Sequence, residues 1–86
     1  MTIYKTPIFL KRFEKLPKEV QTLYKRQELL FQESWLHPLI HTKKLDELPG
    51  AFSFRITRGY RVLFYFRKET AIFFGIGHRK DIYKNL

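Results

Sequence analysis

Arginines that could bind an anion are concentrated in the second half of this chain. From Leu48 onward the sequence holds eight Lys or Arg against two carboxylates. Three of these, Arg55, Arg61 and Arg79, fall on one face of a predicted sheet. Like charges opposite each other destabilise a sheet, so their clustering indicates that something anionic sits between them. Phosphate is the obvious candidate.

The placement of these arginines follows from residues 52–66, which alternate with the period of two that is typical of half-buried strands. A two-residue loop at 58–59 would mix apolar and charged side chains on both faces. A three-residue turn instead pairs Arg55 with Arg61 and sorts the faces cleanly. Since burial fixes register, we predict the second arrangement. Gly59 is expected to supply the positive φ that this turn requires.

A third strand is predicted over residues 71–77, with its apolar positions facing the same core. We expect the inward side chains to be Ile72, Phe74 and Ile76, and the opposite side to carry Phe73, Gly75, Gly77 and Arg79. Because glycine has no side chain, the two glycines would let the backbone of a ligand approach this face closely. The arginines would then line a shallow floor.

The N-terminal half is predicted to form a short strand and two helices. Residues 2–5 are expected to be an edge strand, after which Thr6 and Pro7 give the usual start signal of a helix. Pro17 ends that helix, and a second runs from about Lys18 to about Trp35. The prediction is therefore one α+β domain over residues 1–86 in the order β-α-α-β-β-β, with a two-helix hairpin, an antiparallel three-stranded meander and room for a short C-terminal helix.

Composition narrows the classes of partner and of chemistry. The net charge of +9 favours a polyanion such as RNA or DNA, an acidic protein or a membrane surface. The chain has no cysteine, which fits a reducing cytosol, and no apolar run of the ~20 residues that a membrane span needs. The carboxylates at 46, 47, 69 and 81 form no two-metal pattern, and the three histidines lack ligand spacing, so we expect no metal and no other cofactor.

Two further segments carry residues that could take part in chemistry. The loop between Pro38 and Pro49 contains cations and carboxylates, which by themselves are typical of a solvated surface: His41, Lys43, Lys44, Asp46 and Glu47. The C-terminal run combines His78, Arg79, Lys80 and Tyr83. A histidine can act as acid or base near neutral pH, whereas Tyr and Arg can orient a phosphate. Taken alone, His78 would be a packing residue and Tyr83 a lid over the core; beside the arginines, a functional role is favoured.

An ordered series of short motifs resembles a known family. The matching residues are Thr6-Pro7-x-Phe9, His37-Pro38-Leu39, Leu48-x-Gly50, Arg55-Ile56, Tyr60-Arg61-Val62-Leu63 and Gly77-His78-Arg79-x-Asp81-Ile82-Tyr83. Over nearly the whole chain they resemble the RelE/ParE superfamily of bacterial toxin–antitoxin toxins. The resemblance implies a small cytoplasmic bacterial toxin that a cognate antitoxin neutralises. RelE-type members cleave mRNA in the ribosomal A site, whereas ParE-type members inhibit DNA gyrase.

The resemblance also implies roles for individual residues. Arg61, Arg79, Tyr83 and His78 are expected to be catalytic, and the expected RNA or phosphate ligands are Arg55, Lys43, Lys44, Arg58 and Lys80. One departure matters, because some members carry lysines on the strand where this chain has residues 52–54. The general base is therefore open, with five candidates: His41, Lys43, Lys44, Glu47 and Tyr83.

The sequence thus favours a metal-independent, ribosome-dependent endoribonuclease of the RelE type, with mRNA, the ribosome and an antitoxin as partners and no membrane or small-molecule partner. RNA supplies its own nucleophile, the 2′-hydroxyl, and arginines would stabilise the charge that grows on phosphorus. A ParE-like gyrase inhibitor without nuclease activity is the first alternative, and an RNA-binding domain that has lost catalysis is the second.

Overall fold

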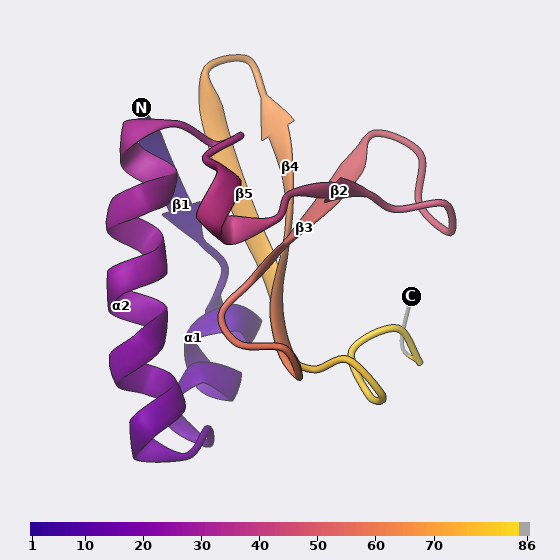
Figure 1. Ribbon diagram of the computed structural model, residues 1–86. Coiled ribbons are helices and arrows are strands. Elements are labelled where there is room, and N and C mark those ends of the chain that lie inside the picture. Colours follow the sequence, from indigo (N-terminus) through magenta and orange to yellow (C-terminus); the bar gives the residue numbers. More distant parts are fainter. Residues whose placement is uncertain (85–86) are drawn as a thin grey trace.

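The computed structural model describes residues 1–84, which form a five-stranded sheet with two α-helices on one of its faces (Figure 1). Across the sheet the strands follow the order β1-β5-β4-β3-β2. Their bounds are β1 Thr2–Lys5, β2 Lys43–Lys44, β3 Ala51–Arg55, β4 Tyr60–Arg67 and β5 Thr70–His78. β1 is parallel to β5, and the other neighbours are antiparallel. The predicted α+β class is confirmed, with β2 as an additional short strand; residues 85 and 86 of the predicted domain lie outside the described residues.

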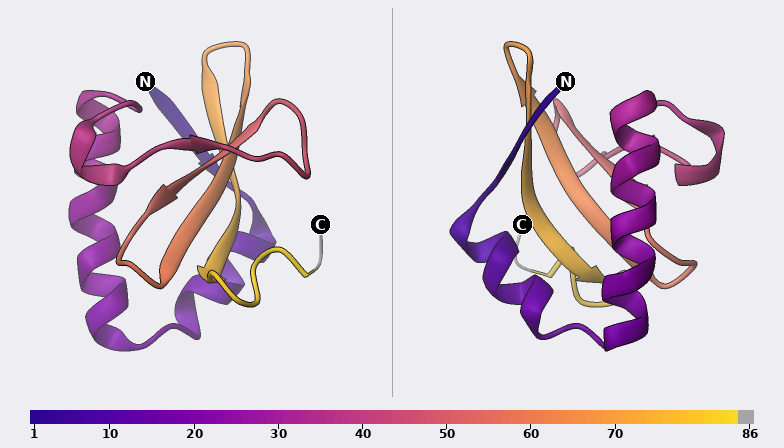
Figure 2. Two further views of the ribbon diagram at one scale, coloured as in Figure 1. Left: turned by 45° about the vertical axis from the view of Figure 1, so that its right-hand side comes forward. Right: turned by 90° about the vertical axis from the view of Figure 1, so that its left-hand side faces the viewer.

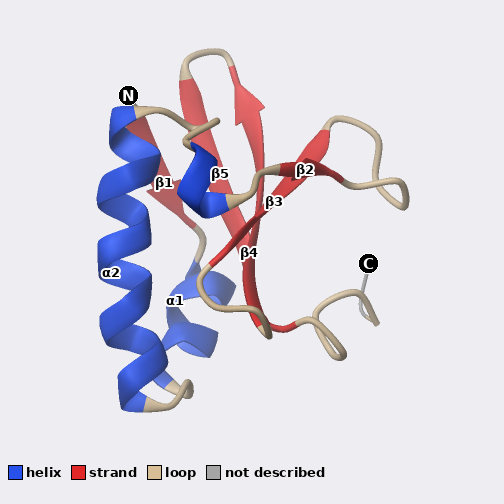
Figure 3. Cartoon of the chain, in the orientation of Figure 1, coloured by secondary structure: helices blue, strands red, loops and turns tan. Residues whose placement is uncertain are grey.

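The two helices begin where the sequence predicts. Helix α1, Pro7–Glu14, follows Thr6, whose Oγ1 accepts a hydrogen bond from the Phe9 amide at 3.1 Å. This bond satisfies one of the amides that the first turn leaves free, and Pro7 has none to satisfy. Helix α2, Lys18–Glu33, follows Pro17, and a short 3₁₀ helix, Pro38–Ile40, comes after it (Figure 3). In Figure 2, β1 leads directly into α1.

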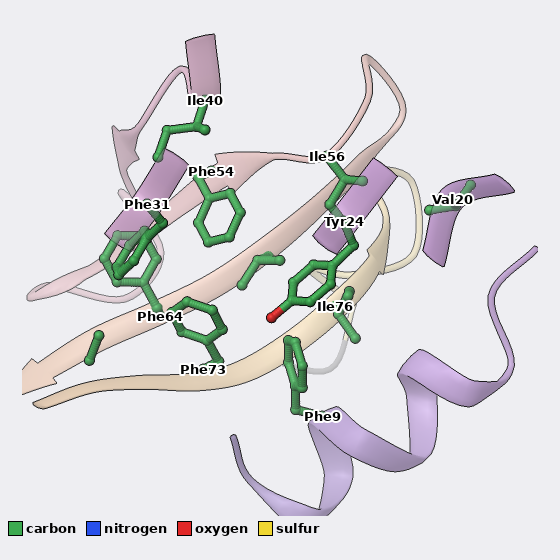
Figure 4. Packing of buried hydrophobic residues seen from close by; sticks show 12 residues of the cluster. Phe9, Val20, Tyr24, Phe31, Ile40, Phe54, Ile56, Phe64, Phe73 and Ile76 are labelled. Atoms are coloured by element: carbon green, nitrogen blue, oxygen red, sulfur yellow. The ribbon is translucent and has the colours of Figure 1, made fainter. Parts of the chain in front are cut away.

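The main core lies between the helices and the sheet. Phe31 of α2 is fully buried, with its ring 5.3 Å from that of Phe54, 5.0 Å from Phe64 and 5.1 Å from Phe73 (Figure 4). The inward faces of three strands thus meet at one helical side chain. The predicted alternation along β3 and β4 is confirmed by this packing, since the even-numbered residues of 52–56 and of 60–66 contribute to the core.

The hairpin between β3 and β4 has the predicted register, with Arg55 directly opposite Arg61. The predicted positive φ at Gly59 is wrong, because among the described glycines only Gly50 has one. Thr57 holds the turn instead, since its Oγ1 accepts from the Gly59 amide at 3.2 Å and the next amide at 3.1 Å. A Cβ on Gly59 would lie 3.0 Å from Nε2 of His78, so the close packing of that ring favours glycine here.

A bulge changes the predicted faces of β5. Leu63 pairs with Gly75, but the next residue of β4 pairs with Phe73, so Phe74 is left over. Phe73 is consequently buried in the main core, whereas Phe74 lies on the opposite face of the sheet. The prediction that Ile72 and Phe74 point inward is wrong, because the extra residue at the bulge moves every earlier residue of the strand to the opposite face of the sheet. Ile76 comes after the bulge and faces the core as predicted.

The face of the sheet away from the helices, which we call the outer face, carries a second small core. Leu45, Ala51, Leu63 and Ile82 are buried there, and Phe74 and Tyr83 pack against them. In Figure 1 the loop after β2 and the C-terminal segment lie on the side of the sheet opposite α2. Residues 79–84 form hydrogen-bonded turns rather than the predicted short helix.

This second core also corrects one expectation about glycine. A Cβ on Gly75 would lie 3.1 Å from the Cδ1 atom of Leu63, so the space above Gly75 is filled by the protein itself. Gly77 has nothing within 4 Å of that position. The open backbone that was predicted at both glycines is therefore found at Gly77 and not at Gly75.

Candidate functional site

A hollow of about 440 Å³ lies on the outer face, between the loop after β2 and the C-terminal segment. We call it the basic pocket. Its lining comes from β2 and the following loop, from β3 and β4, and from the C-terminal turns: Lys43, Lys44, Leu45, Asp46, Glu47, Ser53, Arg61, Arg79, Lys80 and Tyr83. Segments separated by more than thirty residues in sequence therefore contribute to one site.

The sheet fixes the floor of the basic pocket. Arg61 of β4 is half-buried and points to the outer face, because it alternates with the buried Val62. Ser53 of β3 is almost fully buried and stands between two strands, opposite Leu63 on one side and Lys43 on the other. The sheet ladder thus sets Lys43 beside the floor of the pocket.

The C-terminal segment forms the other wall, and three features hold it in place. The Arg79 amide donates to the Gly59 carbonyl at 2.7 Å, which ties the segment to the hairpin turn. The His78 carbonyl accepts from the amides of Asp81 and Ile82, both at 2.9 Å. Ile82 is buried in the outer-face core. These contacts place Arg79 and Tyr83 at the pocket without a helix.

The lining of the basic pocket is strongly cationic. It contains five Lys or Arg side chains, listed above, and two carboxylates, Asp46 and Glu47. Within residues 1–84, none of these seven groups forms a salt bridge with another pocket residue. A concave surface with a net formal charge of three positive units concentrates anions. The pocket is therefore suited to a phosphate group carried by a larger molecule.

Six of the nine predicted site residues meet at the basic pocket: Lys43, Lys44, Arg61, Arg79, Lys80 and Tyr83. Two of the others, Arg55 and Arg58, do not line it. Arg55 sits opposite Arg61 but does not line the pocket, and its Nε is buried with no hydrogen-bond partner among the described residues. Arg58 is exposed in the hairpin turn. The predicted arginine floor is thus formed by Arg61 and Arg79.

His78 lies on the other face of the sheet. It pairs with Tyr60 at the end of β5, and the two rings meet edge to face at 5.3 Å. Its Nδ1 accepts from the Lys80 amide at 3.1 Å, which leaves Nε2 packed against Gly59. Paired residues share a face, and Tyr60 belongs to the main core. The structure therefore separates His78 from Arg61 and gives its ring a role in forming the turn.

Four of the five candidates for a general base line the basic pocket, and the fifth does not. Lys43, Lys44, Glu47 and Tyr83 line it, whereas His41 ends the 3₁₀ helix in a left-handed conformation outside it. Sequence reasoning missed Ser53 as a site residue and did not consider Asp46 as a base. Ser53 alternates with the inward-facing Phe52 and Phe54, so the sequence could have placed it on the outer face. The position of Asp46 depends on a loop that has no periodic pattern.

Residues 1–84 contain neither a metal-binding cluster nor a helix that could span a membrane. Within residues 1–84, no three His, Cys, Asp or Glu side chains gather closely enough to bind a metal ion. No helix in this part of the chain has both the length and the apolar character needed to span a membrane.

Comparison with known proteins identifies the fold. No protein-family model and no curated protein matches the sequence. Solved structures do match: RelE in a RelB–RelE antitoxin–toxin complex from Methanococcus jannaschii is 23% identical with a TM-score of 0.72, over 96% of this chain and 98% of that one. A YoeB/ParE toxin from Agrobacterium tumefaciens is 13% identical with a TM-score of 0.76, over 92% and 99%.

A third match has the same character. YoeB from Staphylococcus aureus, solved as a dimer, is 15% identical with a TM-score of 0.68, over 85% of this chain and 90% of that one. All three alignments span most of both chains, so the likeness concerns the fold as a whole. The chain has the fold of the RelE/ParE toxin superfamily.

Proposed function

We propose that this chain is the toxin of a toxin–antitoxin module and that it cleaves mRNA on the ribosome. The observation that carries the proposal is the convergence of Arg61, Arg79, Lys43 and Tyr83, from separate segments, on one cationic pocket. These residue types are suited to binding and cleaving a phosphodiester. The fold shared with RelE and YoeB toxins supports the same assignment.

The proposed reaction uses the RNA's own 2′-hydroxyl as nucleophile. A base in the pocket removes its proton, the 2′-oxygen bonds to phosphorus, and the bond to the 5′-oxygen breaks as that oxygen accepts a proton. The products are a 2′,3′-cyclic phosphate and a 5′-hydroxyl. Arg61 and Arg79 stabilise the negative charge that grows on the phosphoryl oxygens. Because DNA lacks the 2′-hydroxyl, this route is confined to RNA.

The strand β2 offers a substitute for the lysines that some RelE-type toxins carry on the strand before the hairpin. In this chain Lys43 lies directly opposite Ser53, and Lys44 opposite Phe52, at the positions where the resemblance expects those lysines. Both line the basic pocket. We therefore assign the role of the missing strand lysines to Lys43, which shares the outer face with Ser53, whereas Lys44 pairs with Phe52 of the main core.

Lys43→Ala is accordingly expected to lower the cleavage rate by about 10-fold, less than the ~10²-fold or more of a preorganised donor, because the side chain is exposed. Thermal stability should hardly change. Lys11→Ala is the matched control, since Lys11 is an exposed lysine of α1, away from the pocket. Equal rates for the Lys43 variant and the wild type would remove Lys43 from the mechanism.

Binding of single-stranded RNA should weaken steeply with salt. Each phosphate that the pocket neutralises contributes about −0.7 to the slope of log affinity against log salt, so three contacts would give about −2. A 2′-O-methyl RNA, which cannot be cleaved by the proposed route, allows the measurement by fluorescence anisotropy. A slope near zero would mean that the pocket does not bind phosphates.

A cognate antitoxin is part of the proposal. RelE from Methanococcus jannaschii and its counterpart from Pyrococcus horikoshii were both solved with a RelB antitoxin. An antitoxin segment rich in Asp and Glu could pair with Arg61 and Arg79 through charge-assisted hydrogen bonds. Such a segment would occupy the same pocket as the RNA and block cleavage directly.

The test of the proposed function compares two targets in parallel. The purified protein is added to a translating extract and the mRNA ends are mapped, while the same preparation is added to a gyrase supercoiling reaction. Cleavage at defined positions within codons, with supercoiling unaffected, is the expected result. Intact mRNA together with inhibited supercoiling would overturn the proposal in favour of a ParE-like gyrase inhibitor.

A further inference from the structure

A row of apolar side chains crosses the outer face at some distance from the basic pocket. Tyr4 of β1 pairs with Ile72 of β5, and Ile72 pairs with Tyr65 of β4, so the three lie side by side on adjacent strands. Tyr4 is 52% exposed and Tyr65 is 37% exposed. Two strand spacings separate the tyrosines by about 10 Å. We call these three residues the tyrosine row.

The surroundings of the tyrosine row are cationic. A shallow cavity of about 660 Å³ covers the row and is also lined by Arg67 and Lys68, at the turn that joins β4 to β5. The remaining lining residues are threonines, and no carboxylate lines the cavity. Exposed aromatic rings next to unpaired cations are the combination that binds single-stranded nucleic acid, with bases on the rings and phosphates on the cations.

The tyrosine row is connected to the basic pocket along the same face. The ring of Tyr65 lies 5.6 Å from that of Phe74, and Phe74 packs in the same outer-face core as Tyr83, which lines the pocket. Along β4, Arg61 and Tyr65 are four residues apart, or about 13 Å. A single strand that enters the basic pocket could therefore continue across the tyrosine row.

We propose that the tyrosine row, with Arg67 and Lys68, is a second RNA subsite that stacks the bases flanking the segment held in the basic pocket. The inference rests on the proposed function, since it requires RNA in that pocket. An acidic protein segment could also meet the two cations. The two exposed rings, on β1 and β4 with Ile72 of β5 between them, lie on the same face as the basic pocket and favour stacked bases instead.

The test separates stacking from charge by comparing two ligands. One is a 2′-O-methyl RNA of about 12 nucleotides, and the other is an abasic strand of the same length and charge. The variants are Tyr4→Leu and Tyr65→Leu, which remove a ring but keep an apolar side chain. Leu29→Ala is the control, because Leu29 is 68% exposed and lies on α2, which covers the other face.

The wild type is expected to bind the base-bearing strand more tightly than the abasic strand. Each tyrosine variant should lose about 5- to 100-fold in affinity for the base-bearing strand and little for the abasic one. The Leu29→Ala control should match the wild type with both ligands. Thermal unfolding of each variant confirms that the fold is intact, and Tyr4→Leu replaces only an exposed ring of an edge strand.

Three results would overturn the inference. If both tyrosine variants keep the wild-type preference for bases, the row does not stack RNA. If they weaken both ligands equally, the row acts through charge or folding. If an acidic peptide such as polyglutamate loses affinity for the variants while RNA does not, the row binds a protein. Failure of the wild type to bind either strand would instead refute the proposed function, on which this subsite depends.

Discussion

Arg61→Ala is expected to lower the rate of RNA cleavage by about 10²-fold or more, as the loss of a preorganised donor at a developing charge does in other enzymes. The side chain lies half-buried on the outer face and forms no salt bridge within residues 1–84. Removing it therefore leaves no carboxylate unpaired and relieves the like-charge contact with Arg55. The midpoint of thermal unfolding should stay within a few degrees of the wild type.

Two further variants make this result specific. Arg61→Lys keeps the charge but loses the planar fork that binds two phosphate oxygens, so it should recover only part of the rate. Arg26→Ala removes an exposed arginine of α2, which covers the other face of the sheet, and should cleave like the wild type. Equal losses of thermal stability and activity in Arg61→Ala would make Arg61 a structural residue.

The sequence was sufficient to predict the part of the site that depends on alternation. The period of two over residues 52–66 places Arg61 on the face opposite Phe64, and the choice of register places it opposite Arg55. Both follow from burial, because a register error of one residue would expose the aromatic face. The helix start at Thr6 was equally predictable, since its cap and Pro7 are local signals.

Other features depend on contacts between distant residues and left no local signal. The two residues of β2 are too few to show a period, yet their pairing with β3 is what brings Lys43 to the pocket. The bulge at Phe74 adds one residue to an otherwise regular strand and reverses the faces before it. The His78 ring packs closely on Gly59, and neither residue indicates this contact alone.

The position of His78 also depends on contacts that the sequence does not reveal. A histidine next to an arginine and near a tyrosine suggests acid–base chemistry when only spacing is known. In the fold, alternation at the end of β5 sends His78 to the face of Tyr60, while the chain turn after it carries Arg79 and Tyr83 to the outer face. Residues adjacent in sequence are thus divided between the two faces of the sheet.

The largest loss of stability is expected for Phe31→Ala. The ring is fully buried and contacts an aromatic ring from each of β3, β4 and β5 (Figure 4). Removing a buried phenyl ring costs about 3–5 kcal/mol, which includes the cavity left behind. Since a small domain has about 5–15 kcal/mol in total, the variant should lose a large share of its free energy of unfolding.

Urea denaturation of Phe31→Ala and Leu29→Ala measures this loss against a matched change on the same helix. Leu29 is 68% exposed, so its truncation should alter the free energy of unfolding by less than about 0.5 kcal/mol. Cleavage by Phe31→Ala should fall only in proportion to the unfolded fraction, because Phe31 does not reach the outer face. A loss no larger than that of Leu29→Ala would mean that α2 does not hold the three strands together, and the basic pocket would then need another source of rigidity.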